Sequence, residues 1–178
     1  MKRSPLLTIT AAAFVVAGAS TASAAPPSTT YCAEILSNEV DAQGFSIVLG
    51  TSCSTSPEAA LSTADAEADN SALAPQESAA AASTLLMNEY RDSYLGGGVL
   101  YSYYGAYGTC DSAGYRLRNY WDVGHSVSSI QGNGNCNNVY LTNYAGVSDF
   151  GQTTPVNVLP ARYNDNVDVV RIVYCGKC

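Results

Sequence analysis

The sequence predicts an all-β protein, because its apolar residues follow the spacing of short strands rather than of helices. From Leu85 onward the apolar runs are short, and glycine and asparagine residues separate them, which is typical of strands joined by turns. No helical period extends through this stretch. Residues 31–53 add two apolar runs on either side of a polar turn. The stretch after Leu85 is long enough for a single core between two sheets.

Residues 31–53 are predicted to form a β-hairpin with a two-residue loop at Ala42 and Gln43. This register pairs Val40 with Phe45, Leu36 with Leu49, and Cys32 with Cys53. It places Leu36 and Leu49 on one face of the hairpin. It also makes the two cysteines a non-hydrogen-bonded pair, the closer kind, which suits a disulfide. The alternative is that the two cysteines pair elsewhere.

Residues 57–83 are predicted to be an acidic, alanine- and serine-rich linker. Ser56 followed by Pro57 is a fair helix start, and residues 59–68 have the composition of a short helix that Pro75 would end. Few large apolar residues occur here, so little surface is available to offset the cost of ordering. We therefore expect a hairpin module or pro-region at residues 25–56 and a β-domain at residues 84–178 that folds without it.

The first residues predict export. Lys2 and Arg3 precede an apolar run from Leu6 to Ala19, and the small-residue triplet Ala22-Ser23-Ala24 follows. This is the pattern of a secretory signal peptide, residues 1–24. The run is too short and too often interrupted for a transmembrane helix. The mature protein is expected to be secreted and extracellular.

The charge pattern argues against two classes of partner. Residues 25–83 contain eight acidic residues and no lysine or arginine, and no basic stripe occurs elsewhere. A nucleic acid is therefore not an expected partner. The acidic segment would not bind anionic membranes either, and the protein is expected to be a monomer.

The stretch from Leu85 to Tyr174 contains two copies of one unit. The first copy opens with the segment around Tyr90 and closes with "SVSSI". The second opens with "VYLTNYAG" and closes with "YNDNVDVVRIVY". The first copy is longer, and its extra length fits the loop around Cys110.

The two copies resemble the Greek-key motifs of the βγ-crystallins. Tyr90, Tyr94 and Gly96 match the first signature of that family, two spaced aromatics followed by glycine, and Phe150-Gly151 is a looser match. The glycine at Gly96 would take a positive φ, and an aromatic would cover the turn. The resemblance implies a two-motif Greek-key β-sandwich from about Leu85 to Tyr174, with eight strands in two sheets.

The second signature of the family predicts a calcium site. Residues 164–169 keep its Asn/Asp pair and lose its serines, whereas residues 124–129 keep the serines and lose the acidic pair. In this family each site mixes the two copies, so the resemblance implies one site formed by Asn164, Asp165 and the carbonyl oxygen of Asn166 with Ser128. The alternative is that these asparagine and aspartate side chains only shape the turn by bonding their own backbone.

The complementary calcium site is expected to be inactive. It would need Gly124 and His125 with Asp168. Glycine offers no side-chain oxygen, and histidine is a poor ligand for a hard cation that prefers oxygen.

Within the family, the chain looks most like small exported bacterial proteins grouped with metalloproteinase inhibitors. This resemblance implies a peptidase inhibitor that acts by protein–protein binding, with an extracellular peptidase as partner. The inhibitors use a loop held between nearby cysteines, and this chain has no such close pair within the domain. The alternative is a calcium-binding or structural extracellular protein without inhibitory activity.

No arrangement of residues predicts catalysis, so the protein is not expected to be an enzyme. His125 and Ser126 are neighbours in a turn, where they rarely point at one another usefully. Cys175 and Cys178 trail a strand instead of opening a helix, which a redox pair needs. The tyrosines at positions 101, 103, 104 and 107 are more simply explained by packing than by a binding surface.

An even number of cysteines in an exported chain indicates disulfides. The predicted pairs are Cys32–Cys53, Cys110–Cys136 and Cys175–Cys178. The first follows from the hairpin register. The second joins the long loop of the first copy to the link between the copies, and the third is assigned by elimination.

Overall fold

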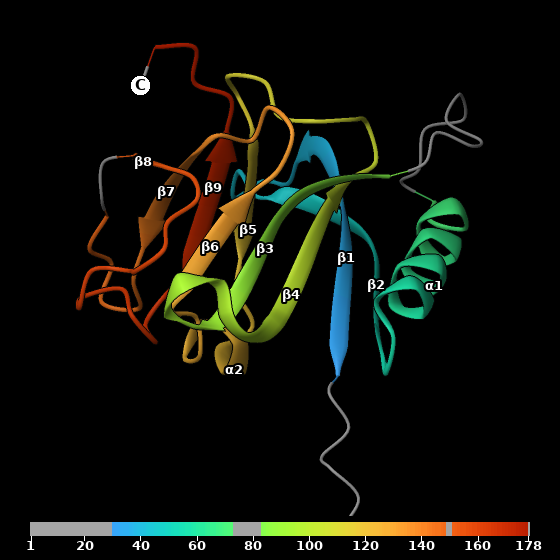
Figure 1. Ribbon diagram of the computed structural model, residues 1–178. Coiled ribbons are helices and arrows are strands. Elements are labelled where there is room, and N and C mark those ends of the chain that lie inside the picture. Colours follow the sequence, from blue (N-terminus) through green and yellow to red (C-terminus); the bar gives the residue numbers. More distant parts are fainter. Residues whose placement is uncertain (1–29, 73–82, 149–150, 178) are drawn as a thin grey trace, which may run out of the picture.

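The chain folds into two β-sheets that face each other (Figure 1). The computed structural model describes residues 30–72, 83–148 and 151–177. The first sheet contains, in spatial order, β2 (Ser46–Ser54), β1 (Tyr31–Val40), β4 (Gly96–Gly105), β3 (Thr84–Asp92) and β6 (Ser129–Gly132). The second contains β5 (Tyr115–Arg118), β9 (Val169–Val173), β7 (Asn138–Thr142) and β8 (Gln152–Thr153). The prediction of a mostly β protein with two sheets is confirmed.

The described residues also form three short helical segments: α1 (Pro57–Asp69), the 3₁₀ turn η1 (Ser93–Leu95) and α2 (Trp121–Gly124). No helix in the described ranges is both long enough and apolar enough to cross a membrane. The predicted signal peptide, residues 1–24, lies outside the described residues.

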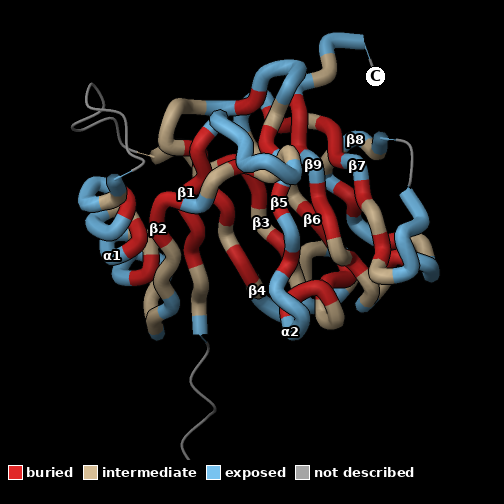
Figure 2. Tube along the Cα trace, turned by 180° about the vertical axis from the view of Figure 1, so that it is seen from behind, coloured by how far each residue is buried: buried red, intermediate tan, exposed pale blue. Residues whose placement is uncertain are grey.

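The main core lies between the two sheets (Figure 2). Apolar side chains from both sheets fill it, and the largest that are fully buried include Leu36, Leu86, Met87, Ile130, Leu141 and Ile172. Tyr101 and Tyr103 also point inward, with ring centroids 5.0 Å apart. Tyr104 and Tyr107 pack on the other side of the first sheet, against a second cluster that includes helix α1.

The N-terminal hairpin continues the first sheet and is not a separate module. β1 pairs with β4 in parallel, with Cys32 opposite Tyr101 and Leu36 opposite Gly105. The backbone N–H of Arg116 on β5 donates to the hydroxyl of Ser46 on β2 at 3.1 Å, so the hairpin also contacts the second sheet. The predicted boundary at residue 84 therefore divides one continuous sheet.

The hairpin register agrees with the prediction only near the disulfide. Cys32 lies opposite Cys53, but a bulge after Ile35 places Leu36 opposite Val48. Leu36 thus packs into the main core, whereas Leu49 packs against α1 on the other face. The predicted single face for Leu36 and Leu49 is wrong, because one extra residue in a strand reverses every side chain beyond it.

The turn of the hairpin is longer than the predicted two residues. The carboxylate of Asp41 accepts hydrogen bonds from the backbone N–H groups of Gln43 and Phe45, both at 2.9 Å. Gly44 takes a φ of 76°, a conformation that favours glycine. An Asp-capped turn with glycine near its end forms here in place of the tight loop.

Helix α1 occupies the first part of the predicted linker and packs on the outer face of the first sheet. Ser56 caps it, accepting from the N–H of Ala59 at 3.1 Å, and Pro57 opens it. Its buried side chains are three alanines spaced four residues apart, Ala60, Ala64 and Ala68. Small side chains bury little area each, but they let the helix backbone approach the sheet closely. The expectation of an unpacked linker is thus wrong for residues 57–69, and residues 73–82 lie outside the described part.

Two of the three predicted disulfides are present. Cys32–Cys53 joins β1 to β2, and Cys110–Cys136 joins the loop after β4 to the segment before β7. Cys175 is also disulfide-bonded. Its predicted partner, Cys178, lies outside the described residues.

The turn that carries the first crystallin-like signature differs from its prediction. Gly96 has a φ of −93°, whereas Tyr94 and Leu95 have positive φ values of 60° and 59°. Tyr94 is 76% exposed, so it does not cover the turn. Its N–H instead donates to the carbonyl of Asn157 at 2.6 Å, and this bond to the second copy holds the turn. Phe150 of the looser match lies outside the described residues.

Candidate functional site

The structure brings together Ser128 of the first predicted copy and Asp165 of the second. The hydroxyl of Ser128 donates to Oδ1 of Asp165 at 3.4 Å. Ser128 is buried immediately before β6, where its N–H donates to the carbonyl of Tyr90 at 2.9 Å and its carbonyl accepts from Leu159 at 3.0 Å. These bonds fix the backbone of Ser128, and the carboxylate of Asp165 lies exposed beside its hydroxyl.

The turn before β9 holds Asp165 in an unusual conformation. Its φ is 54°, a left-handed value that aspartate tolerates better than most residues do. Its N–H donates to the carbonyl of Val127 at 2.9 Å, which ties the turn to the other copy. The approach of the two segments thus rests on backbone bonds as well as on the Ser128–Asp165 contact.

The side chains of Asn164 and Asn166 act as donors within the turn. Nδ2 of Asn164 donates to Oδ2 of Asp165 at 2.7 Å, and Nδ2 of Asn166 donates to the carbonyl of Arg162 at 3.1 Å. An amide has nearly the same shape when rotated by half a turn, which would direct the oxygen of Asn164 toward the same point. The prediction for Asn166 uses its carbonyl oxygen and does not depend on its side chain.

The chemistry of this donor set suits a weakly held hard cation. The part of the chain that the structure describes contains no group of three or more His, Cys, Asp or Glu side chains that could hold a metal ion. A cation beside Asp165 would therefore take one carboxylate and neutral oxygens from hydroxyl, amide and carbonyl groups. Calcium accepts such mixed oxygen ligands.

The complementary position is filled by protein side chains. Asp168 lies 3.4 Å from the guanidinium of Arg118 (Oδ1 to Nε). The ring of His125 packs against those of Trp121 and Tyr144, with centroids 3.8 and 4.4 Å apart. A side chain at Gly124 would collide with the phenol of Tyr144. Asp168 already has a cationic partner, and no side-chain oxygen comes from Gly124.

A buried polar cluster beneath this region is not predicted by any motif. Glu89 on β3 is completely buried, and its Oε1 accepts from Nδ2 of Asn119 at 3.0 Å. The hydroxyl of Tyr103 lies 3.0 Å from Oδ1 of Asn119 and 3.4 Å from Oε2 of Glu89. Burial raises the pKa of Glu89 to about 7, although the hydrogen bonds from Asn119 and Tyr103 oppose this effect.

Glu34 on β1 is the second buried carboxyl group. It is 3% exposed, and burial raises its pKa to about 7 against the opposing effect of a hydrogen bond to Tyr120. Its charge also contributes to the raised pKa of Glu89. The sequence contains one signal for both residues, an acid within an apolar strand ("YCAEILS" and "TLLMNEY"). Because strand faces alternate, that signal becomes useful only once the register is known.

Comparisons with known proteins do not identify a relative. The chain matches no protein-family model, and neither curated proteins nor solved structures contain a significant match to it.

Proposed function

We propose that the chain is an exported Greek-key module of the βγ-crystallin type that binds one calcium ion. The strand order supports this arrangement. In the first copy β4, β3 and β6 are neighbours in one sheet, whereas β5, which lies between β4 and β6 in the sequence, joins the other sheet. In the second copy β8, β7 and β9 are neighbours, and Val156 bridges to Ile130 on β6 of the opposite sheet. In each copy, three strands are therefore neighbours in one sheet, and the third segment along the chain (β5 or the segment at Val156) pairs with the opposite sheet.

The observation that carries calcium binding is the meeting of Ser128 with Asp165. These residues are far apart in the sequence, and the family pattern pairs a hydroxyl of one copy with an acidic turn of the other. The 3.4 Å contact brings the hydroxyl oxygen of the buried Ser128 beside the exposed carboxylate of Asp165, which supports the proposal. With a single carboxylate, the dissociation constant is expected at about 10⁻⁴ to 10⁻³ M, the range of extracellular calcium modules.

Thermal unfolding of the mature protein with calcium and with a chelator tests this proposal. Calcium at about ten times its dissociation constant stabilises the folded state by roughly 1.4 kcal/mol. For a folded unit of this size, that free energy corresponds to a rise in Tm of about 3 to 6 °C. Asp165→Asn should abolish the rise, and Ser128→Ala should reduce it.

Asp69→Asn is the matched control, because Asp69 is an exposed aspartate at the end of α1. Its calcium response should equal that of the unaltered protein. Equal Tm values with calcium and chelator would contradict the proposal, as would a calcium response that survives Asp165→Asn.

A second candidate function is inhibition of an extracellular peptidase, and the loop at residues 143–148 favours it. Oδ1 of Asn143 accepts from the N–H groups of Ala145 and Val147 at 3.1 and 2.9 Å. Its Nδ2 donates to the carbonyl of Arg162 at 3.1 Å. Val147, 44% exposed, is thus presented on a loop that has little conformational freedom to lose on binding.

Inhibition is tested by incubating the mature protein with secreted metallo- and serine peptidases. If the loop is the contact, Val147→Ala should weaken inhibition by roughly tenfold, the usual effect of removing a moderately important interface side chain. Val158→Ala is the control, since Val158 is similarly exposed (50%) on a different loop. An unaffected peptidase panel would dismiss inhibition, and equal effects of the two variants would dismiss this loop.

A further inference from the structure

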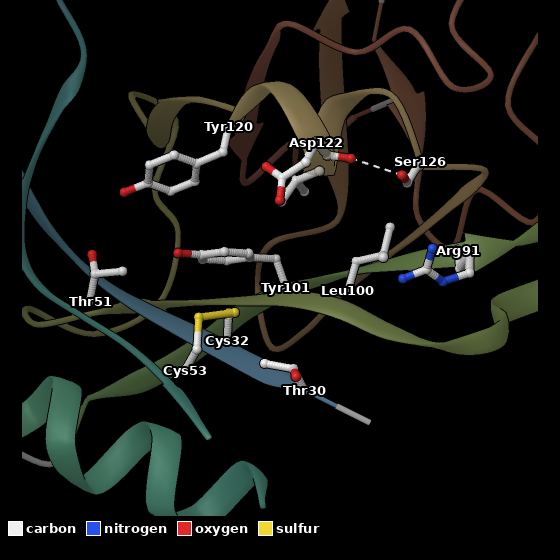
Figure 3. Close-up of a pocket in the computed structure, with 11 residues that line it drawn as sticks. Thr30, Cys32, Thr51, Cys53, Arg91, Leu100, Tyr101, Tyr120, Asp122 and Ser126 are labelled. Atoms are coloured by element: carbon white, nitrogen blue, oxygen red, sulfur yellow. Dashed lines mark hydrogen bonds between the residues drawn. A yellow bond between two sulfur atoms is a disulfide. The ribbon is translucent and has the colours of Figure 1, made fainter. Parts of the chain in front are cut away.

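A cleft of about 580 Å³ opens where the N-terminal hairpin meets the segment that connects the two sheets (Figure 3). One side is formed by β1, β2 and β4, and the other by the residues around α2. Its lining includes Tyr101, Tyr120, Asp122, Arg91, Thr51 and the Cys32–Cys53 disulfide. This volume falls within the range of sites for small organic ligands.

The apolar part of the cleft is aromatic and firmly held. The rings of Tyr101 and Tyr120 lie 5.7 Å apart, tilted by 32°. Tyr101 is buried, whereas Tyr120 is 49% exposed, so Tyr120 offers most of the accessible ring surface. Its hydroxyl is hydrogen-bonded to the buried Glu34. A bound molecule would therefore meet an aromatic surface that is already ordered.

The polar part of the cleft combines acceptors and donors. Asp122 and Arg91 are exposed residues that extend into it from different sides, as Figure 3 shows. Within the described ranges, neither side chain takes part in an ion pair. The hydroxyl groups of Thr30 and Thr51 lie on the sheet side.

We propose that this cleft binds a neutral saccharide, with one sugar ring stacked on Tyr120. A pyranose has an apolar C–H face, which suits the negative face of an aromatic ring. Its edge carries hydroxyl groups that both donate and accept. The carboxylate of Asp122 would accept from them, and the guanidinium of Arg91 would donate to them, which makes strong charge-assisted hydrogen bonds. This binding site is independent of calcium and of the loop at residues 143–148.

A purely anionic ligand would pair with Arg91 but would be repelled by Asp122, so it would satisfy only one of the two charges. A zwitterion such as a free amino acid or dipeptide would satisfy the two charges but would leave the ring of Tyr120 without a matching face. The saccharide uses all three features, and the zwitterion serves as a competing outcome in the test.

The test is an amide NMR titration of the mature protein with soluble oligomers of glucose, N-acetylglucosamine and xylose, and separately with dialanine. We expect saturable shifts from at least one saccharide, clustered at residues 30, 51, 91, 100–101 and 120–126. Asp122→Asn should weaken that binding by about tenfold or more, the factor for losing a hydrogen bond to a charged group. Tyr120→Ala should weaken it further, and Tyr120→Phe should retain the stacking.

Matched controls separate binding from folding. Glu39→Gln removes an exposed acid on β1, and Tyr140→Ala removes an exposed tyrosine from the second sheet; both should bind as the unaltered protein does. If Tyr120→Ala does not fold, Asp122→Asn and Tyr120→Phe still decide the question. The proposal is overturned if no saccharide binds at millimolar concentration, if only dialanine binds, if the shifts map elsewhere, or if Asp122→Asn binds as tightly as the control variants.

Discussion

Glu89 occupies a position where an ionised carboxylate is costly, and its neighbours indicate how the cost is reduced. The single phenol hydrogen of Tyr103 cannot serve both Oδ1 of Asn119 and Oε2 of Glu89. When Glu89 is protonated, its own hydroxyl donates to Tyr103, Tyr103 donates to Asn119, and the amide of Asn119 donates back to Glu89. This closed ring satisfies every group, which matters because unpaired polar groups are expensive in a buried site.

The raised pKa of Glu89 predicts how stability depends on pH. Its pKa rises from 4.5 to about 7 on folding, so the folded protein retains a proton that the unfolded chain releases in this interval. The contribution of Glu89 to the free energy of unfolding is therefore greatest at acidic pH, falls as pH rises from about 4.5 to 7, and stays lower above that range. Glu34 acts in the same direction.

Glu89→Gln tests this dependence, because glutamine is neutral and its amide can donate to Tyr103. At about pH 8 the variant should be more stable than the unaltered protein by on the order of 1 to 3 kcal/mol, with little difference at about pH 4. Denaturant unfolding at both pH values measures the effect. Glu39→Gln, at an exposed position, should leave the pH profile unchanged. A profile that Glu89→Gln also leaves unchanged would show that Glu89 does not hold the proton.

At the scale of elements, helix α1 depends on a close approach to β2. An added side chain at Gly50 would overlap the backbone carbonyl of Ala64 and lie 2.9 Å from the N–H nitrogen of Ala68. The three buried alanines and this glycine thus form complementary surfaces, and packing this tight leaves no space for a methyl group. Close packing of the helix backbone against β2 therefore holds α1 in place, because its apolar side chains are small and bury little area.

Gly50→Ala should therefore displace α1 and lower the free energy of unfolding by about 1 to 3 kcal/mol, the usual cost of overpacking. Denaturant unfolding measures the loss, and amide NMR shifts along residues 57–69 locate it. Gly176→Ala is the control, because its added methyl group would make only ordinary contacts of 3.4 Å or more. A Gly50→Ala protein as stable as the control would mean that the helix adjusts at no cost.

At the scale of the whole molecule, the N-terminal hairpin completes the first sheet. It supplies Leu36 and Glu34 to the interior and covers the edge of β4. It also forms one wall of the cleft at Tyr120. Removing it would expose the edge of β4 and the buried rings of Tyr101 and Tyr103, and an uncovered strand edge promotes aggregation.

A chain beginning at residue 84 should thus fail to fold into a stable monomer, contrary to the two-module organisation that composition predicts. A chain beginning at residue 30 retains the hairpin and serves as the control. Circular dichroism, thermal unfolding and size-exclusion chromatography compare the two. Cooperative unfolding and monomeric elution of the shorter chain would show that the hairpin is dispensable.

Sequence patterns predicted some local features correctly, and they were wrong about others that also involve only a few neighbouring residues. The pairing of Cys32 with Cys53 was predicted from the hairpin register and is present. The same register failed beyond Ile35, because a bulge leaves no clear signal in the sequence. Positive φ falls at Tyr94 and Leu95 instead of Gly96, where a hydrogen bond to the second copy holds the turn. Long-range contacts here override local preference.

The sequence by itself determined the β character of the chain, the cap at Ser56 and the Cys32–Cys53 pair. These features follow from short-range spacing, which can be followed along the chain, whereas the contact between Ser128 and Asp165 was implied only by the resemblance to the βγ-crystallins. Only the tertiary structure decided the parallel pairing of β1 with β4, the burial of Glu34 and Glu89, and the cleft between Tyr120 and Arg91. Each joins segments tens of residues apart, and a buried acid or an exposed tyrosine acquires its role only from what the fold packs against it.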